Sequence, residues 1–259
     1  MKKFGLIGYP LVQSFSKAFF TEKFKELGLE DHEYNLYPIE ALSDFPQLIQ
    51  NEPELAGLNV TIPYKIGVMF YLDAVSEEAK AVDAVNCIKI TQKDLLSDYF
   101  SGELSLDRMH LEGFNTDVYG FEESLKPLLQ KQHTKALVLG HGGAARAVTY
   151  VLKKLQIEFN IVSRKASHLH LSYSDLTEED IKDHKLIIDT TPVGTYPDIH
   201  EHVDIPYSGI GSEHLLYDLV YNPSETEFLK RGRLQGAVTK NGLEMLHLQA
   251  EKSWEIWQS

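Results

Sequence analysis

The sequence predicts an α/β protein of two domains in which helices pack against sheets. Three observations support this fold class. Short apolar runs alternate with segments of helical periodicity, a glycine-dense turn joins one such run to an amphipathic helix, and the chain has 259 residues, of which 43% are hydrophobic. Because domains commonly contain ~100–200 residues, a chain of this length can bury two modest cores.

The N-terminal part is predicted to begin with a strand at residues 4–7, a turn, and a helix with apolar residues on one side. Ser14 and Ser16 stand just before this helix. Serine at that position ordinarily caps a helix, although two neighbouring hydroxyls can also bind a carboxylate. Further elements are predicted as a strand at 34–39, a short helix at 41–49, a strand at 58–62, a short helix at 76–81 and a strand at 84–90.

Polar side chains gather near the end of the strand predicted at 58–62. Asn59 and Thr61 are two residues apart, which places both side chains on one face of that strand, and Lys65 follows just past its end. Such a lysine is ordinarily a solvated surface charge, but polar groups at the carboxyl end of a strand favour a crevice. Asn86 lies in the next predicted strand, where an interior asparagine must find hydrogen-bond partners.

The segment from residue 91 to residue 110 is polar and irregular, which predicts an inserted hairpin or loop without chemistry. Asn115, Thr116 and Asp117 then crowd the start of a helix, where Asp117 can serve simply as a cap. The helix is predicted from apolar residues at helical spacing, namely Val118, Phe121, Leu125 and Leu128.

A glycine-dense turn follows the apolar strand predicted at 135–139. Gly140, Gly142 and Ala145 fit the pattern G-x-G-x-x-G/A, in which the glycines allow a tight turn and close approach to a pyrophosphate. Alone, the pattern fits an ordinary tight loop equally well. The preceding strand and the following amphipathic helix favour a dinucleotide site, and the buried face of that helix is predicted from Val148, Val151, Leu152 and Leu155.

The end of the next strand, predicted at 159–162, indicates which dinucleotide binds. Ser163, Arg164 and Lys165 follow it, whereas an NAD site usually has an acidic residue there for the ribose 2′-hydroxyl. Two cations without an acid suit a 2′-phosphate and therefore predict NADP. The later strands, predicted at 185–189 and 215–220, alternate with helical segments and imply a parallel sheet in this domain.

Two helices close the chain. Ser224 and Glu227 fit a capping box at the start of the first, which is expected to run toward Gly232. The last helix opens after Gly242 and carries two tryptophans, which need a large apolar partner surface. We therefore predict that this helix packs back on the first domain, where Gln249 either lies near the polar crevice or is merely solvated.

Composition excludes several classes of function. The formal charge of −13 and the isoelectric point near 5.3 repel polyanions, which argues against a nucleic-acid partner. A single cysteine, Cys87, provides no disulfide framework, suits a reducing compartment and is expected to be an inert buried thiol. No apolar run approaches the ~18 residues of a membrane span, and no signal core is apparent, so we expect a cytoplasmic protein without a membrane partner.

Taken together, these motifs resemble the shikimate dehydrogenase family over nearly the whole chain. The resemblance implies a substrate-binding domain at 1–116 and 241–259 and a Rossmann-like NADP-binding domain at 117–240. It also implies the reversible NADPH-dependent reduction of 3-dehydroshikimate to shikimate, an oxidoreductase step of chorismate and aromatic amino acid biosynthesis, in a monomer or homodimer that needs no metal. The motifs that carry the resemblance are Ser14-x-Ser16, Asn59-Val-Thr61-x-Pro63-x-Lys65, Val85-Asn86, Gly113-x-Asn115-Thr116-Asp117, the glycine turn and Gly242-x-x-Met245-Leu246-x-x-Gln249.

The family's functional residues can be carried over to matching positions of this sequence. The resemblance implies that Lys65 and Asp117 form the catalytic pair. It assigns the substrate carboxylate to Ser14, Ser16 and Tyr221. It assigns the substrate hydroxyls to Thr61, Asn86, Asp117 and Gln249, and it includes Asn59 among the substrate-binding residues. It assigns the pyrophosphate to Gly140, His141, Gly142, Gly143 and Ala144, the adenosine end to Ser163, Arg164 and Lys165, and the nicotinamide side to the Leu219 and Gly242 backbone. It also includes Thr190 in the cofactor site and matches Glu77 to a position sometimes near the cofactor.

The chain departs from the family pattern at several positions, and two alternative functions stay open. Gln13 stands where histidine is common, Lys17 where proline is common and Cys87 where threonine is common, while Ser163-Arg164-Lys165 replaces Asn-Arg-Thr. A quinate/shikimate dehydrogenase that uses NAD is one alternative, and a non-catalytic nucleotide-sensing protein of the same fold is the other. Assays with quinate and with each cofactor distinguish them.

Overall fold

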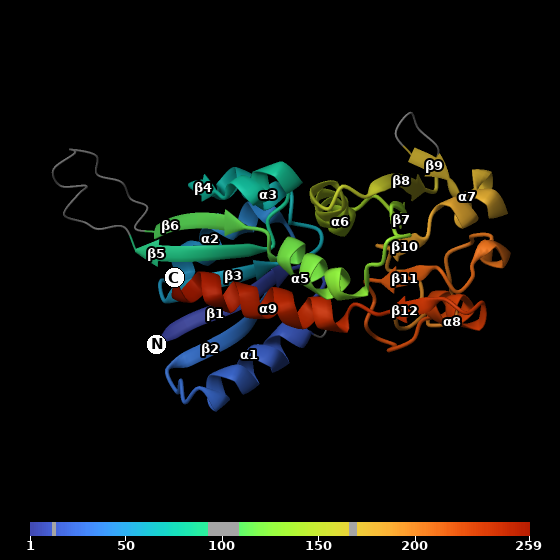
Figure 1. The fold of residues 1–259 in the computed structure, drawn as a ribbon. Coiled ribbons are helices and arrows are strands. Elements are labelled where there is room, and N and C mark those ends of the chain that lie inside the picture. Colours follow the sequence, from blue (N-terminus) through green and yellow to red (C-terminus); the bar gives the residue numbers. More distant parts are fainter. Residues whose placement is uncertain (12–13, 93–108, 166–169) are drawn as a thin grey trace. The chain divides into compact units, whose positions relative to one another are not determined.

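The computed structural model describes residues 1–11, 14–92, 109–165 and 170–259 (Figure 1). It confirms the predicted α/β class. Most of the polar segment predicted as an insert, residues 93–108, lies outside the described residues. The chain forms two compact units, of which the first comprises Met1–Thr116 and Ala250–Ser259 and the second comprises Asp117–Gln249. Helix α9 (Leu243–Gln258) contributes residues to both units, and the predicted domain boundary at residue 241 stays a prediction.

The first unit is built on a six-stranded mixed sheet with the order β2-β1-β3-β5-β6-β4. Neighbours on the β2-β1-β3 side are parallel, whereas β5 pairs antiparallel with both β3 and β6. The strands are β1 (Lys2–Gly8), β2 (His32–Pro38), β3 (Leu55–Val60), β4 (Ala74–Val75), β5 (Cys87–Gln92) and β6 (Met109–Phe114). The helical segments are α1 (Phe15–Glu26), η1 (Leu42–Asp44), α2 (Phe45–Asn51), η2 (Gly67–Tyr71) and α3 (Glu77–Val82).

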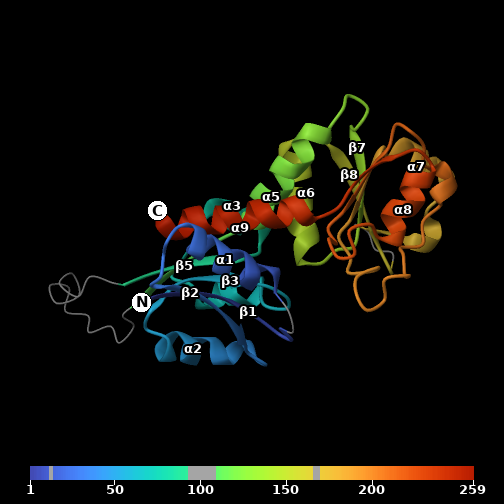
Figure 2. The same ribbon diagram turned by 90° about the horizontal axis from the view of Figure 1, so that it is seen from below.

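Both faces of this sheet are covered, as Figure 2 shows, with α1 and the end of α9 on one face and α2 on the other. Side chains alternate between the faces along a strand. Phe4 of β1 accordingly packs with Phe20 and Trp257, while Ile7 belongs to the opposite core with Phe45 of α2. The prediction that the C-terminal tryptophans pack on the first domain is confirmed, since the Trp257 indole donates to the Ile88 carbonyl at 3.0 Å.

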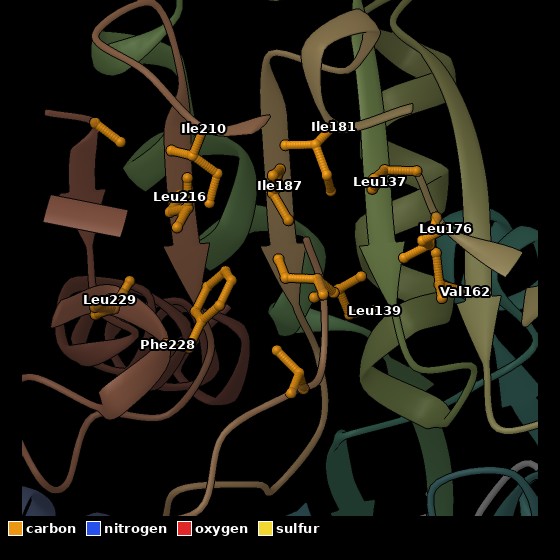
Figure 3. Packing of buried hydrophobic residues seen from close by; sticks show 13 residues of the cluster. Leu137, Leu139, Val162, Leu176, Ile181, Ile187, Ile210, Leu216, Phe228 and Leu229 are labelled. Carbon is orange, nitrogen blue, oxygen red and sulfur yellow. The ribbon is translucent and has the colours of Figure 1, made fainter. Parts of the chain in front are cut away.

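The second unit contains a six-stranded sheet in which every pair is parallel, as predicted, with the order β12-β11-β10-β7-β8-β9. Figure 3 shows its main apolar core, where Ile187 and Leu216 of the strands meet Phe228. The strands are β7 (Lys135–Leu139), β8 (Glu158–Ser163), β9 (His170–Ser172), β10 (Leu186–Asp189), β11 (Leu215–Asp218) and β12 (Val238–Lys240). The helical segments are α5 (Thr116–Leu125), η3 (Lys126–Leu128), α6 (Gly143–Lys154), η4 (Tyr173–Asp175), α7 (Glu178–Asp183), η5 (Tyr207–Gly209) and α8 (Glu227–Leu234).

The structure corrects the predicted start of helix α8. The N-cap is Thr226, whose hydroxyl accepts from the Leu229 N–H at 3.4 Å, and not Ser224. The Thr226 hydroxyl also donates to the buried Asp218 carboxylate at 2.5 Å, and this contact from a neighbouring strand fixes the register of the cap. A local sequence pattern contains no information about that strand.

Two strands also have ends that differ from the predicted ones. Strand β3 ends at Val60, so Thr61 lies just past the strand and not within it. Strand β5 begins at Cys87, which leaves Asn86 immediately before it. Among the described residues, no helix has the length and apolar character needed to cross a bilayer.

Candidate active site

The glycine turn after β7 has the conformation that a close approach requires. Gly140 has φ +100°, which side-chain-bearing residues rarely adopt, and its N–H donates to the Val162 carbonyl at 2.8 Å. A Cβ at Gly140 would lie 2.7 Å from the Thr190 hydroxyl oxygen. The backbone of β7, β8 and the Thr190 turn therefore meets at Gly140 with no room for a side chain.

Helix α6 begins directly after this turn at an N-terminus suited to an anion. Its N-cap, Gly142, has no side chain that could accept from the first-turn N–H groups, and no acidic residue lies in that turn. A Cβ built on Gly142 meets no heavy atom of the described chain within 4 Å. Open backbone N–H groups at the positive end of a helix bind phosphate. The turn formed by Gly140, His141, Gly142, Gly143 and Ala144 thus fits a pyrophosphate.

The end of β8 presents the two predicted cations. The buried Ser163 hydroxyl donates to the Lys165 carbonyl at 2.6 Å and thereby holds the turn, while the side chains of Arg164 and Lys165 are exposed. Ser163 is thus placed to fix the backbone, and the two cations are placed to meet an anion. This arrangement fits the 2′-phosphate end of NADP.

The remaining predicted cofactor residues of the second unit gather beyond β10 and β11. The Thr190 N–H and hydroxyl both donate to the Leu139 carbonyl, at 2.9 and 2.7 Å. The Gly242 N–H donates to the Val220 carbonyl at 3.1 Å, and a Cβ at Gly242 would collide with the Leu219 carbonyl. The structure therefore brings Leu219 and Gly242 together, as their assignment to one part of the cofactor requires.

The predicted carboxylate-binding serines occupy the start of helix α1. Ser14 is the N-cap, and its hydroxyl accepts from the Lys17 N–H at a long 3.4 Å. Ser16 interacts with the Tyr34 hydroxyl, which is buried; burial holds the pKa of that phenol well above its usual value. Ser14 thus caps the helix through a weak hydrogen bond. Ser16 is not the cap, so capping does not explain why a serine stands there.

A buried polar network lies behind the predicted substrate residues of the first unit. The Asn59 side-chain oxygen accepts from the Tyr34 hydroxyl at 2.8 Å, and its amide nitrogen donates to Ser253 at 2.9 Å. The Asn86 side-chain oxygen accepts from the Thr116 N–H at 2.6 Å, and its amide nitrogen contacts the Thr116 hydroxyl at 3.0 Å. The network therefore fixes the first residue of α5 against the ends of two strands.

Ser253 and Tyr34 are residues of this network that the sequence reasoning missed. Ser253 lies four positions after Gln249, hence on the same side of helix α9, and its hydroxyl lies 3.3 Å from that of Thr116. The sequence could have indicated Ser253, because it is a polar residue one helical turn after the predicted site residue Gln249. Tyr34 is surrounded by aromatic residues, among them Phe20, and gave no comparable signal.

Lys65 lies in the turn between β3 and η2, and hydrogen bonds from three residues of this turn hold it in place. Its carbonyl accepts from the Val85 N–H at 2.7 Å, and the Thr61 N–H donates to the Ile7 carbonyl at 3.0 Å. The Tyr64 hydroxyl donates to the Ile39 carbonyl at 2.6 Å. Lys65 therefore projects from a well-fixed turn rather than from a loose surface loop.

In the second unit, Asp117 lies in the first turn of α5 and is 7% exposed. Three residues later, a Cβ at Gly120 would lie 2.5 Å from the Met245 carbonyl and 3.1 Å from the Gln249 Cβ, so α5 and α9 pack closely here. Since positions three apart share one helix face, Asp117 and Gln249 lie along the same helix–helix contact. Tyr221 is 37% exposed, and partial burial raises the pKa of its phenol.

The surroundings of Glu77 and Cys87 indicate no direct part in the chemistry. The Glu77 side chain is 91% exposed and accepts a hydrogen bond from Lys80 at 2.7 Å. Cys87 is fully buried, and burial raises the pKa of its thiol to about 12, as befits the inert thiol that was expected. Within the described ranges, no group of three or more acidic, histidine or cysteine side chains is arranged to hold a metal.

Comparisons with known proteins identify the family. A protein-family model described as the shikimate dehydrogenase substrate binding domain matches residues 6–88. The chain is 37% identical to "Shikimate dehydrogenase (NADP(+))" of Clostridium beijerinckii, a match that covers 100% of this chain and 92% of the relative.

Solved structures agree. Shikimate 5-dehydrogenase of Thermus thermophilus, in complex with NADP(H) and shikimate, is 28% identical with a TM-score of 0.81 and coverage of 99% and 93%. Shikimate 5-dehydrogenase of Listeria monocytogenes, in complex with shikimate and NAD, is 26% identical with a TM-score of 0.82 and coverage of 100% and 92%. This chain therefore belongs to the shikimate dehydrogenase family.

Proposed function

We propose that this chain catalyses the reversible NADPH-dependent reduction of 3-dehydroshikimate to shikimate. The observation that carries the proposal is the open N-terminus of α6 behind Gly140 in a chain of this family, with Arg164 and Lys165 exposed at the neighbouring strand end. The relative from Clostridium beijerinckii is named for NADP, and the Thermus thermophilus structure contains NADP(H) with shikimate. The single buried cysteine supports a reducing, cytoplasmic location.

In the proposed cofactor site, backbone groups and positively charged side chains bind the phosphates. The turn from Gly140 to Ala144 holds the pyrophosphate, Arg164 and Lys165 hold the 2′-phosphate, and the Leu219 and Gly242 backbone borders the nicotinamide side. Bound NADPH supplies the hydride that reduces the C3 carbonyl carbon of the substrate. Glu77, exposed and paired with Lys80, has at most a peripheral part.

The proposed chemistry of the chain itself is proton transfer. When C3 is reduced, its oxygen acquires negative charge and must take up one proton. The Lys65 ammonium stabilises that charge and donates the proton, and in the reverse direction the Lys65 amine accepts it. Asp117 orients the hydroxyl and the lysine. The backbone hydrogen bonds around Lys65 support this role, because a proton donor works best from a fixed position.

The proposed substrate site divides into two groups. Ser14 and Ser16, with Tyr221, bind the carboxylate, whereas Thr61, Asn86, Asp117 and Gln249 bind the hydroxyls. Asn59 is assigned a positioning role, because both ends of its side-chain amide are engaged in interior hydrogen bonds with Tyr34 and Ser253.

The first test compares cofactors in steady-state oxidation of shikimate. We expect a higher kcat/KM with NADP than with NAD. The Arg164→Ala variant should raise the KM for NADP by ~10- to 100-fold, the equivalent of the charge-assisted hydrogen bonds that Arg164 would make to a phosphate, and leave that for NAD nearly unchanged. Arg233→Ala, which removes an exposed arginine paired with Glu225, is the matched control. Equal or better use of NAD by the parent would refute NADP preference, and no turnover with either cofactor would refute the activity.

The second test asks whether the serines bind substrate. Ser16→Ala should raise the KM for shikimate by ~10-fold or more, because a hydrogen bond to a charged group is lost. If capping were the only role of Ser14, Ser14→Ala would cost ~1 kcal/mol of stability, or ~2–4 °C in Tm, with an unchanged KM. Thr21→Ala removes a hydroxyl from the same helix and should leave the KM alone. Should Ser16→Ala lower Tm and keep the parental KM, the carboxylate role is wrong.

A further inference from the structure

Two aspartates end neighbouring strands in the interior of the second unit. Asp189 closes β10 and Asp218 closes β11, and the two residues are direct partners in the parallel register. Both are 0% exposed. Each lies two positions after a core residue, Ile187 or Leu216, so both carboxyl groups point toward the apolar core shown in Figure 3.

The hydrogen bonds to this pair are incomplete. Asp189 accepts from the Thr191 N–H at 2.8 Å with Oδ1, whereas its Oδ2 is buried without a partner. Asp218 accepts from the Val220 N–H at 2.9 Å and from the Thr226 hydroxyl at 2.5 Å. The Thr191 side chain also interacts with the Asp189 carboxyl, but Asp189 Oδ2 stays without a donor. A buried carboxylate oxygen without a donor is costly when it is charged, but far less so when it carries a proton.

No cation among the described residues balances the charge of this pair. Over the described residues, no lysine, arginine or histidine forms an ion pair or hydrogen bond with either carboxylate. The titratable groups that face the pair are Tyr173 of η4 and Tyr207 of η5. The Tyr207 hydroxyl already donates to the Val203 carbonyl at 2.9 Å. Farther out, Arg164 acts on Tyr173, and Arg231 and Asp204 act on Tyr207.

Ionising two carboxyl groups at adjacent buried positions costs free energy, because the two negative charges repel each other. Burial raises the pKa of Asp189, and the charge of Asp218 raises it further. Burial also raises the pKa of Asp218, to about 6. The physical expectation is therefore a pair that keeps one proton near neutral pH.

The same two side chains hold the turns that carry predicted cofactor residues. Asp189 fixes the turn that contains Thr190 through the Thr191 N–H, and its own carbonyl accepts from the Leu219 N–H at 2.9 Å. Asp218 fixes the next turn through Val220, whose carbonyl in turn accepts from Gly242. Any repulsion between the two carboxylates is therefore applied directly to these turns.

We propose that Asp189 and Asp218 share one proton and, as positioning residues, hold the Thr190 turn and the turn after β11 in place for the cofactor. When both ionise, the proton leaves Asp189 Oδ2 for solvent and the turns are pushed apart. The cofactor part of this inference rests on the proposed function, whereas the proton-sharing part does not.

The sign of the pH dependence follows from the raised pKa values. An unfolded chain ionises these carboxyls near the ordinary value of ~3.9, and the folded chain does so at higher pH. The unfolded state therefore binds fewer protons, and the stability present below pH ~4 is lost as pH rises through 6 and above.

Asp189→Asn tests the pair, because its side-chain oxygen still accepts from Thr191 while its amide nitrogen donates where the proton was. Measured without ligand, the Tm of the variant should match the parent near pH 4 and exceed it by ~3 °C or more at pH 8. Asp183→Asn is the control: Asp183 pairs with Lys135, which lowers the pKa of its carboxyl, so this variant should lose Tm at pH 8 rather than gain it. An Asp189→Asn protein that melts below the parent at pH 8 would overturn the inference.

Two further measurements complete the test. Infrared spectra of the parent at pH 7 should contain the band of a protonated carboxyl; its absence would overturn the inference even if Asp189→Asn fails to fold. The KM for NADP should rise with pH above 7 in the parent and stay flat in Asp189→Asn. If the Tm and infrared results hold but NADP supports no turnover, the proposed function fails and proton sharing stands. If NADP turns over with the same pH profile in both proteins, the positioning role fails.

Discussion

Replacing Lys65 with alanine is expected to lower kcat by ~10³-fold, within the range typical of a lost general acid or base. The backbone of Lys65 is held by the Val85 N–H, so the substitution should remove the ammonium without moving the turn. Steady-state shikimate oxidation measures kcat, and binding of NADP to the variant, measured by fluorescence titration, should be unchanged. Lys65→Met keeps much of the side chain's length without its charge and should behave like the alanine variant.

The same experiment tests whether Lys65 and Asp117 work as one unit. Asp117→Ala should also depress kcat strongly, and the double variant should be scarcely worse than the poorer single one. Lys80→Ala is the matched control, since Lys80 is an exposed lysine paired with Glu77, and it should retain parental kcat. A kcat for Lys65→Ala within about twofold of the parent, less than ~0.5 kcal/mol of barrier, would return Lys65 to the role of an ordinary surface charge.

The parts of the fold that could be predicted from sequence are those encoded locally. Residues 135–147 contain the strand, the tight turn and the buried helix face within one short window, and Gly140 has the positive φ that its place in the pattern requires. The exposed cations after β8 were predictable for the same reason. Each is a property of the chain over a few residues.

The missed elements depend on distant partners. Strand β6 was not predicted, because His110, Glu112 and Gly113 interrupt any apolar run, and pairing with β5 and β4 makes it a strand. Strands β9 and β12 have three residues each, too few for a periodic signal. The Thr226 cap was missed because its second partner, Asp218, lies on another strand.

The candidate site shows the same division. Most of its residue types were predicted, but the buried network behind them links Asn59 with Ser253, 194 positions away. Nothing in the sequence near Asn59 indicates that its amide is engaged in the interior. Likewise, Asp189 and Asp218 become a pair only through the register of β10 and β11.

Trp257 is expected to contribute more to stability than any other single side chain of the terminal helix. Its ring lies 4.9 Å from that of Phe4 and 5.1 Å from that of Phe20, its N–H donates to the Ile88 carbonyl, and it fills the space over Gly57 that a Cβ would otherwise enter. Trp257→Ala should therefore cost ~3–5 kcal/mol of unfolding free energy, the range for large aromatic truncations. Urea unfolding measures it, and because the chain has 2 tryptophans, the remaining Trp254 reports on the first unit alone.

Trp257→Phe separates the two contributions of the indole. Phenylalanine retains most of the packing but leaves the Ile88 carbonyl without its donor, so this variant should lose only ~1–3 kcal/mol. Trp254→Ala, which truncates a half-buried ring one turn earlier, should cost less than Trp257→Ala, with Trp257 then serving as the fluorophore. A loss below ~1 kcal/mol for Trp257→Ala, the size expected of an ordinary surface change, would mean that the end of α9 is not part of the first unit's core. The covering role that closes one face of that sheet would then belong to α1 alone.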